Sequence, residues 1–338
     1  MDRLGLEHPV VQAGMGGGVA GGDLAGAVSA AGGLGTVGMM APAAFAAGIG
    51  RARRRAPGRP VAANLLVPFV RRAHVDICIA AGVSLVVLHD GLPPRGIAAL
   101  RAAHIPVFVT VGTAAEALRA LVAGADGLVV QGIEAGGHLV ASQPLETALS
   151  EVLAVAEDVP VFAAGGVAEA DDVRRLLAVG ATAAVAGTRF LLTEESRAHP
   201  GYKQRVLDAD RTLVTLLFGF GWPLPHRVVP NALTDRWCAA GDAGPGWVRR
   251  VGRLSAPVGR GLPLSALGTM IKMQRAGVPF FTPALPLAGM PEASVDRSAL
   301  YAGETLKRLQ QVIPAEEAVA RLVPGPVPGR ASGADGTA

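Results

Sequence analysis

The sequence predicts an α/β protein, a (β/α)8 barrel with a lid insertion rich in Pro and Gly before the closing C-terminal helix. Eight short apolar runs recur along the chain, and each is continuous rather than alternating, which is typical of parallel strands covered on both faces. A helical pattern rich in Ala and Leu separates successive runs. Half of the 338 residues are apolar and only 17% are charged, enough for a large core. A doubly wound open sheet is the alternative.

The predicted strands are apolar segments bounded by turn residues. They comprise residues 9–12, 34–38, 61–67, 84–89, 106–111, 127–131, 160–164 and 182–187. Helical patterns lie between them, for example at 21–32, 113–124 and 169–180. The last of these has acidic residues in its first turn and stops at Gly180, as the helix dipole and C-cap preferences favour. Strand and helix therefore alternate regularly as far as residue 190.

Beyond Phe190 the regular alternation ends, and a segment rich in Pro and Gly carries all three tryptophans. The predicted parts are 1–205 for the barrel, 206–295 for a lid and substrate subdomain, 296–323 for the segment that closes the barrel, and 324–338 for a disordered tail. Within the closing segment, helical patterns at 298–312 and 314–323 predict two helices. Pro314 suits the start of the second one.

Composition restricts the class of protein. The net charge is +4, and the arginine clusters at 51–59 and 249–253 lack interleaved aromatic residues. We therefore expect solvated helix ends or anion-attracting rims and no nucleic-acid partner. The two cysteines form no CxxC pair, so a reducing cytoplasm is expected. The sequence shows no signal peptide and no apolar run of membrane-spanning length, so we expect no membrane partner; a homodimer stays open.

Polar residues stand at the carboxyl ends of the predicted strands, where barrels carry their chemistry. The residues at these ends, with Met15 and glycines included, are Gln12, Met15, Asn64, His89, Asp90, Thr110, Gln131, Gly165, Gly166, Gly187 and Thr188. The amide of Asn64 interrupts an apolar strand and needs a partner there. The set is nearly uncharged and lacks the ligand spacing of a metal site, such as HExxH. It suits a neutral, planar ligand rich in heteroatoms, and no metal is expected.

Two glycine-rich loops follow the seventh and eighth strands, "FAAGGVAEA" and "AVAGTRF". Their backbone N–H groups can approach an anion, and barrels place phosphates at these two loops. Neutral amides together with a phosphate clamp suggest a phosphorylated flavin. The G-x-G-x-x-G match at Gly16, Gly18 and Gly21 lacks the acidic residue about 20 positions on that a dinucleotide site needs. We interpret it as a turn that brings backbone close to a flat ligand.

Histidine is the candidate for proton transfer, because it titrates near neutrality. His138 follows the strand 127–131 in "EAGGH", where Gly136 and Gly137 permit close ligand contact. His89 ends the fourth strand and also reaches the rim, and His226 can line the same cavity from the lid. The residue chemistry favours His138 over His89 without excluding the latter. His74 and His104 are predicted to be solvated.

Three segments together resemble the nitronate monooxygenase family, formerly called 2-nitropropane dioxygenases. They are "VVQAGMGGGVAGGDLAGAVSAAGGLGTVG", "VVQGIEAGGH" and "PVFAAGGVAEADDVRRLLAVGATAAVAGTRFLLTEES". The resemblance implies a barrel, FMN as cofactor, and His138 as the base or acid beside the flavin. It implies FMN contacts at Met15, Asn64, Gln131, Gly136, Gly166, Gly187 and Thr188. The family often has Pro where this chain has Gly14, and Gln-Met where it has Val185 and Ala186.

The activity that the resemblance implies is oxidation of alkyl nitronates, such as propionate 3-nitronate, by O2 to a carbonyl compound and nitrite. His138 would deprotonate a neutral nitroalkane or hydrogen-bond the nitronate. One alternative is an NAD(P)H-dependent flavin reductase acting on a quinone or an enoyl thioester. Another is a flavin-free barrel acting on a phosphorylated metabolite. Such enzymes usually use a Lys or carboxylate at strand ends, whereas Lys203, Lys272 and Lys307 lie on no predicted strand.

Overall fold

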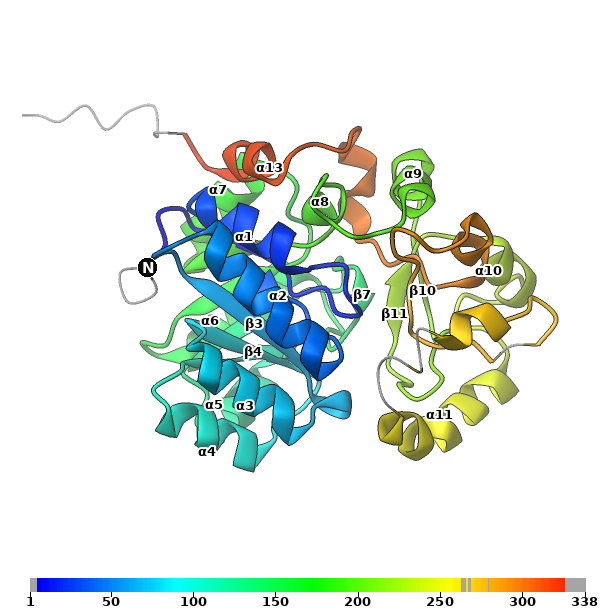
Figure 1. The fold of residues 1–338 in the computed structure, drawn as a ribbon, viewed down its shortest axis with the longest axis horizontal. Helices are drawn as coiled ribbons and strands as arrows, with labels where there is room; N and C mark the ends of the chain where they lie inside the picture. The colour runs from blue at the N-terminus through cyan, green and yellow to red at the C-terminus, as the bar shows by residue number, and fades with distance from the viewer. Residues whose placement is uncertain (1–4, 263–265, 267–268, 279, 326–338) are drawn as a thin grey trace, which may run out of the picture.

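The computed structural model describes residues 5–262, 266, 269–278 and 280–325. Eight parallel strands form a nearly closed barrel with helices around it (Figure 1). The barrel strands are β1 Val10–Gln12, β2 Gly35–Val37, β3 Val61–Leu66, β4 Leu85–His89, β5 Val107–Val111, β6 Gly127–Gln131, β8 Val161–Ala164 and β9 Ala183–Ala186. Each predicted strand is present. The order β1-β9-β8-β6-β5-β4-β3-β2 follows the chain around the ring.

The ring closes through Leu34, which directly precedes β2. Its backbone N–H donates to the Val10 carbonyl at 2.9 Å, and its carbonyl accepts from the Gln12 N–H at 3.0 Å. On its other side β1 pairs in parallel with β9, with Val11 opposite Val185. The predicted (β/α)8 barrel is confirmed, and the open-sheet alternative is wrong.

Helices cover the outside of the barrel: α1 Gly22–Ala30, α2 Pro42–Arg55, α3 Arg72–Ala81, α4 Pro94–Ala102, α5 Ala114–Val122, α6 Leu145–Ala156, α7 Ala170–Val179, α8 Thr188–Leu191 and α13 Ala315–Leu322. Their ends follow local chemistry. The Thr113 hydroxyl caps α5 by accepting from the Glu116 N–H at 3.3 Å. Helix α7 stops at Gly180, whose φ of +121° suits glycine. Helix α13 packs on α1 and α7, as expected for a closing helix.

Side chains fill the barrel interior near the amino ends of the strands, below the cavity that opens at their carboxyl ends. Phe108 and Phe162 pack against each other with ring centroids 4.8 Å apart. Gly127 makes this possible, because a Cβ there would lie 2.4 Å from the Phe108 ring. The barrel interior is therefore closely packed near the amino ends of the strands, and a candidate site is left at their carboxyl ends.

The segment 206–295, here called the lid, lies beside the carboxyl end of the barrel (Figure 1). It contains β10 Leu213–Thr215, β11 His226–Val228, α10 Ala232–Trp237, α11 Gly246–Gly261 and the short 3-10 helix η3 Ile271–Met273. Helix α9 Pro200–Asp208 and the 3-10 helix η4 Glu292–Arg297 overlap its two ends, and η5 Glu304–Arg308 follows it. Strands β10 and β11 form an antiparallel sheet with β7, Gly137–His138, from the barrel loop. The division of the chain into domains stays a prediction.

The helix predicted over 298–312 is wrong. Only η5 is helical there, and Tyr301 instead forms an antiparallel bridge with Val228. The Gly303 N–H donates to the Thr188 hydroxyl at 2.9 Å, and the backbone of Gly303 is extended, with φ −87° and ψ 177°. The helix predicted over 314–323 is confirmed by α13. Most of the predicted tail, from residue 326 onward, lies outside the described residues.

The composition led to expectations about the cysteines, the arginine clusters and membrane-spanning segments. Cys78 and Cys238 are buried and unpaired. The arginines Arg53, Arg54 and Arg55 end α2 and are exposed, as predicted for a solvated helix end. In the part of the chain that the structure describes, no helix is both long and apolar enough to cross a membrane.

Candidate active site

A cavity of about 310 Å³ opens at the carboxyl ends of the barrel strands. It is bounded on one side by strand-end residues such as Asn64, His89 and Gln131, and on the other by residues of the lid and of the segment after it, including Trp222, Leu285 and Tyr301. Its volume is at the lower end of the range, about 300–1,000 Å³, that is common for small-molecule sites. The lining is mainly apolar with a few polar groups, which is the usual composition of a ligand pocket.

The structure brings seven of the eight predicted site residues to this cavity. They are Met15, Asn64, Gln131, Gly136, His138, Gly187 and Thr188. Gly166 is not part of the lining; it has φ +69°, and its carbonyl accepts from Arg308 Nη2 at 2.8 Å. Gly16 and Gly17 also line the cavity, in keeping with a turn that approaches a flat ligand.

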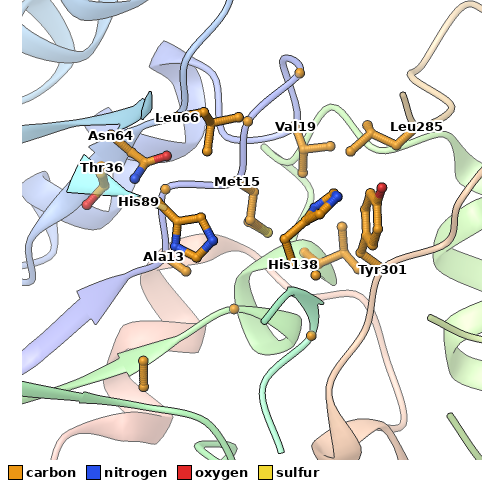
Figure 2. A pocket seen from close by; sticks show the side chains of 18 of the residues that line it. Ala13, Met15, Val19, Thr36, Asn64, Leu66, His89, His138, Leu285 and Tyr301 are labelled. Carbon is orange, nitrogen blue, oxygen red and sulfur yellow. The ribbon is translucent and has the colours of Figure 1, made fainter. Parts of the chain in front are cut away.

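His138 is positioned by hydrogen bonds from both the barrel and the lid. The Gln131 amide donates to the His138 carbonyl at 3.1 Å and accepts from the Val140 N–H at 2.8 Å, which fixes the loop after β6. On the other side β7 pairs with β11, with His138 opposite His226. The His138 side chain therefore occupies one defined place at the cavity wall, beside Tyr301 in Figure 2.

The His138 ring stacks on Trp222 from the lid, with ring centroids 3.6 Å apart and planes inclined by 9°. Trp222 is fixed in turn, because its indole N–H donates to Asp90 Oδ2 at 2.7 Å. Asp90 follows β4 and has φ +60°, an unusual conformation for a residue other than glycine. Barrel and lid are thus joined directly at the candidate catalytic side chain.

The surroundings keep His138 neutral. Burial lowers its pKa well below the ordinary value of 6.5, and the nearby His226 and His89 lower it further, since a second positive charge there would be repelled. Its Nε2 is buried and has no hydrogen-bond partner among the described residues. A buried polar atom without a partner is rare, so this nitrogen is available to a ligand.

His89 and His226 have different surroundings. His226 is fully buried, and both of its ring nitrogens are engaged: Nε2 accepts from the Phe218 N–H at 3.3 Å, and Nδ1 lies 2.9 Å from the Leu224 carbonyl. It does not line the cavity. His89 does line it and meets Trp222 edge to face at 6.0 Å. Burial lowers the pKa of both, that of His226 to about 4.

The prediction that His74 is solvated is wrong. His74 is buried, its Nε2 lies 3.0 Å from the Met40 carbonyl, and its Nδ1 accepts from the Arg71 N–H at 3.0 Å. It acts as a structural cap at the start of α3. His104 is exposed, as predicted.

Two more buried polar atoms at the cavity have no partner among the described residues, Asn64 Oδ1 and Thr36 Oγ1. The Asn64 amide nitrogen donates to the Val87 carbonyl at 3.3 Å, which leaves its oxygen as an unused acceptor. An acceptor, a hydroxyl and an imidazole nitrogen around an apolar cavity fit a planar, heteroatom-rich group such as a flavin.

Gly14 determines where Asn64 can lie. A Cβ at position 14 would be 2.2 Å from Asn64 Cβ and 3.1 Å from Thr36 Cγ2, far closer than atoms can approach. The glycine that stands where the family often has proline therefore makes room for the Asn64 side chain. The sequence alone shows that Gly14 differs from the family's frequent proline, but not that this glycine makes room for Asn64.

Gly187 and Thr188 line the cavity beside the segment around residue 302. The Thr188 hydroxyl accepts from the Gly303 N–H, and a Cβ at Gly136 would lie 2.5 Å from the backbone of Ala302 and Gly303. The glycine loop after β6 and the segment around 302 are therefore in close backbone contact. This contact needs glycine at position 136.

Sequence reasoning missed two aromatic residues at the site, Trp222 and Tyr301. The Tyr301 ring centroid lies 5.3 Å from that of His138, and its hydroxyl donates to the Pro283 carbonyl at 2.9 Å. Burial raises the pKa of Tyr301 well above its ordinary value, so it stays protonated. The only signal was that all the tryptophans lie in the lid.

The chain is similar to a known protein family and to several individual proteins. The family model for nitronate monooxygenase matches residues 1–73 and 61–325. A "(3aS,4S,5R,7aS)-5-hydroxy-7a-methyl-1-oxo-octahydro-1H-indene-4-carboxyl-CoA dehydrogenase" from Mycobacterium tuberculosis is 31% identical, over 95% of this chain and 94% of that protein. A nitronate monooxygenase from Pseudomonas aeruginosa is 32% identical over 63% of this chain and 75% of its own length.

Solved structures extend the likeness to the whole fold. A nitroalkane oxidase from Streptomyces ansochromogenes superposes with a TM-score of 0.74 at 28% identity, covering 94% of this chain and 95% of its own. FabK from Thermotoga maritima has a TM-score of 0.72 at 25% identity, covering 95% and 93%. With a family model that matches almost all of the described chain, this protein is an enzyme that belongs to the nitronate monooxygenase family of flavin-dependent oxidoreductases.

Proposed function

We propose that this enzyme uses FMN to oxidise alkyl nitronates with O2, yielding a carbonyl compound and nitrite. The observation that carries the proposal is the neutral His138, whose buried Nε2 lacks a protein partner at an apolar cavity. The likeness to a nitroalkane oxidase over the whole fold supports it. An alkyl nitronate is small and planar and has one charged end, which suits a mainly apolar cavity with a few polar groups.

The cofactor contacts belong to the proposal. Asn64 and Gln131 would hold the flavin ring at the strand ends, Met15 and Gly136 would pack on it, and Gly187 with Thr188 would receive the phosphate. The chemistry supplied by bound FMN is acceptance of electrons from the substrate and their transfer to O2. Gly166 is proposed to shape the phosphate end through its backbone rather than to line the cavity.

His138 has one of two tasks, depending on the form of the substrate. With a neutral nitroalkane, its unprotonated nitrogen accepts the proton from the carbon next to the nitro group. With an anionic nitronate, a protonated nitrogen donates a hydrogen bond to an oxygen of the substrate. The low pKa ensures that the unprotonated form is present at neutral pH, and the negative charge of a bound nitronate favours protonation again.

Product analysis tests this function. Purified protein saturated with FMN is incubated in air with propionate 3-nitronate, and nitrite, carbonyl product and O2 consumption are measured together. The proposal requires nitrite and carbonyl product in equal amounts, with O2 consumed only when the nitronate is present. Absence of nitrite from a protein that holds FMN would exclude the activity.

A second candidate is oxidation or reduction of a coenzyme A thioester with the same cofactor. It is favoured by the whole-chain match to a carboxyl-CoA dehydrogenase and by the similar fold of FabK. It includes an NAD(P)H-dependent reductase acting on an enoyl thioester; reduction of a quinone by the same flavin is the variant without a thioester. Incubation of the FMN-loaded protein with acyl-CoA and an artificial electron acceptor, or with enoyl-CoA and NADH, tests it, because only this candidate predicts a change in the thioester.

A further inference from the structure

A second cavity, of about 170 Å³, lies on the outside of the barrel between the start of α7, helix α8, the segment after η5 and α13. It is lined by Ala168, Glu169, Arg189, Arg308, Leu309, Gln310, Gln311 and Arg321. None of these residues lines the first cavity. Three guanidinium groups and one carboxylate therefore face a small polar space that has no part in the proposed oxidation.

Arg189 is the unusual member of this set. Its side chain is only 2% exposed, and its Nη2 donates to the carbonyls of Leu192 at 2.7 Å and Gln311 at 2.9 Å. Its Nε is buried without a partner, and no described carboxylate forms an ion pair with it. A buried cation normally has a counter-charge, because leaving water is otherwise costly.

The neighbouring charges are already matched. Arg308 forms an ion pair with Asp172, at 3.0 Å between Nη2 and Oδ2, and Arg321 is paired with Glu317. Burial lowers the pKa of Arg189 to about 10; the positive charge of Arg321 lowers it as well, and the negative charge of Glu317 raises it. Glu169 is the only acidic residue in the lining, and it is exposed to solvent, which screens its charge. Arg189 therefore has no ion pair of its own among the described residues, and Glu317, the carboxylate that acts on its charge, is already paired with Arg321.

We infer that this cavity binds a small oxyanion, such as inorganic phosphate or the terminal group of a phosphomonoester, with Arg189 and Arg321 as its hydrogen-bond donors. Guanidinium groups bind phosphate through paired N–H donors, so the residue type matches the ligand. Leu309 is the largest apolar side chain in the lining, and the two glutamine amides add further donors. The lining suits a hydrophilic ion and not an apolar molecule.

The site shares its walls with the proposed cofactor site. Thr188 lines the first cavity, whereas the next residue, Arg189, lines the second. Arg308 lines the second cavity and holds the carbonyl of Gly166 in the loop after β8. A bound oxyanion would therefore stabilise the two backbone segments, after β8 and after β9, that approach the cofactor phosphate.

Titration calorimetry tests the inference. Inorganic phosphate and glycerol 1-phosphate are each added at constant ionic strength to FMN-loaded protein from which unbound FMN has been removed, with chloride as the reference anion. Saturation with FMN occupies the first cavity, so one additional equivalent of anion reports the second. Binding of either compound above chloride supports the inference, and the tighter of the two identifies the source of the oxyanion. Equal, weak heats for all three anions overturn it.

Matched variants locate the anion. Arg321→Gln removes one charged donor from a half-exposed side chain and should weaken binding about tenfold. Glu169→Gln removes the rim carboxylate and should strengthen binding about twofold. Arg189→Gln should abolish binding, and if it fails to fold, the other two variants still decide. Unchanged affinity in both Arg321→Gln and Glu169→Gln overturns the assignment.

Crystals soaked in selenate provide a direct location, because selenium marks a tetrahedral oxyanion by its anomalous signal. A peak within hydrogen-bond distance of Arg189 is expected. A selenate site found only in the first cavity or on the surface contradicts the inference.

Discussion

The barrel and the lid place their site residues in different ways. Barrel residues such as Asn64 and Gln131 reach the cavity because the strand ends converge there, and this placement does not depend on how the lid folds. Trp222 of the lid arrives through individual long-range contacts, with His138 on one face and Asp90 at its indole nitrogen. The barrel therefore supplies the strand-end residues of the proposed cofactor site, whereas the lid determines the surroundings of His138, the candidate catalytic side chain.

The small antiparallel sheet shows where the two regions meet. Strand β7 leaves the barrel after β6, and β11 of the lid pairs with it, so that His138 and His226 lie opposite each other. This arrangement buries both imidazoles, and burial lowers the pKa of each. The following predictions separate the contributions of the barrel and the lid.

The largest effect is expected from His138→Ala. Loss of a general base typically costs about 10²–10⁴-fold in rate, so turnover of a neutral nitroalkane should fall by that factor while FMN stays bound. Steady-state kinetics and the visible spectrum measure the two properties. His104→Ala, at an exposed position, is the matched control. Near-normal turnover of the neutral nitroalkane by His138→Ala would remove this residue from the mechanism.

Trp222→Ala removes the lid's contact with His138. Trp222 is 4% exposed and packs on Phe69, His89 and His138. Truncating a buried tryptophan costs about 3–5 kcal/mol of folding free energy, which denaturant unfolding measures. Trp247→Ala, at a residue that is 51% exposed, should cost about 1 kcal/mol or less. Equal losses in the two variants would mean that the lid does not support the site through Trp222.

Acid should weaken the junction between barrel and lid. The folded-state pKa of His226 is about 4, below the ordinary 6.5, so the unfolded chain takes up the proton more readily. Its contribution, about 3 kcal/mol at 1.36 kcal/mol per unit, is fully present above about pH 6.5 and is lost as the pH falls towards 4. Melting temperatures between pH 7 and pH 4 should therefore fall less steeply for His226→Gln than for the unaltered protein. Parallel curves would contradict this.

The smallest effect is expected at the barrel rim. Gly14→Ala places a Cβ against Asn64 and should cost about 1–3 kcal/mol in folding free energy, together with weaker FMN binding. Asn64→Ala in the same chain removes the Cγ contact at 2.8 Å but keeps the Cβ contact at 2.2 Å. The double variant should therefore recover part of the folding free energy and none of the FMN affinity. Fluorescence titration with FMN follows the affinity; full recovery of FMN binding would show that Asn64 is not a cofactor contact.

The sequence was sufficient for elements that depend on local patterns and for residues at strand ends. The eight strands, the closing helix α13 and the rim position of His138 all follow from apolar runs, caps and the barrel rule. The helix predicted over 298–312 failed because Tyr301 pairs with Val228 and Gly303 with Thr188. These are tertiary contacts that override a helical pattern.

The same limit explains the errors at single residues. Nothing in the sequence around His74 indicates that its ring nitrogen will lie next to the carbonyl of the distant Met40. Trp222 could be assigned to the lid but not to the face of His138, since that contact depends on how the lid folds. Each error concerns a contact between segments far apart in sequence.

The most direct test of the proposed nitronate oxidation is the flavin spectrum under anaerobic conditions. FMN-loaded protein is mixed with propionate 3-nitronate in one sample and with NADH in another, and the absorbance of the oxidised flavin is followed. Nitronate oxidation predicts rapid bleaching by the nitronate and none by NADH. Bleaching by NADH alone, with the nitronate inert, would contradict it and identify a reductase.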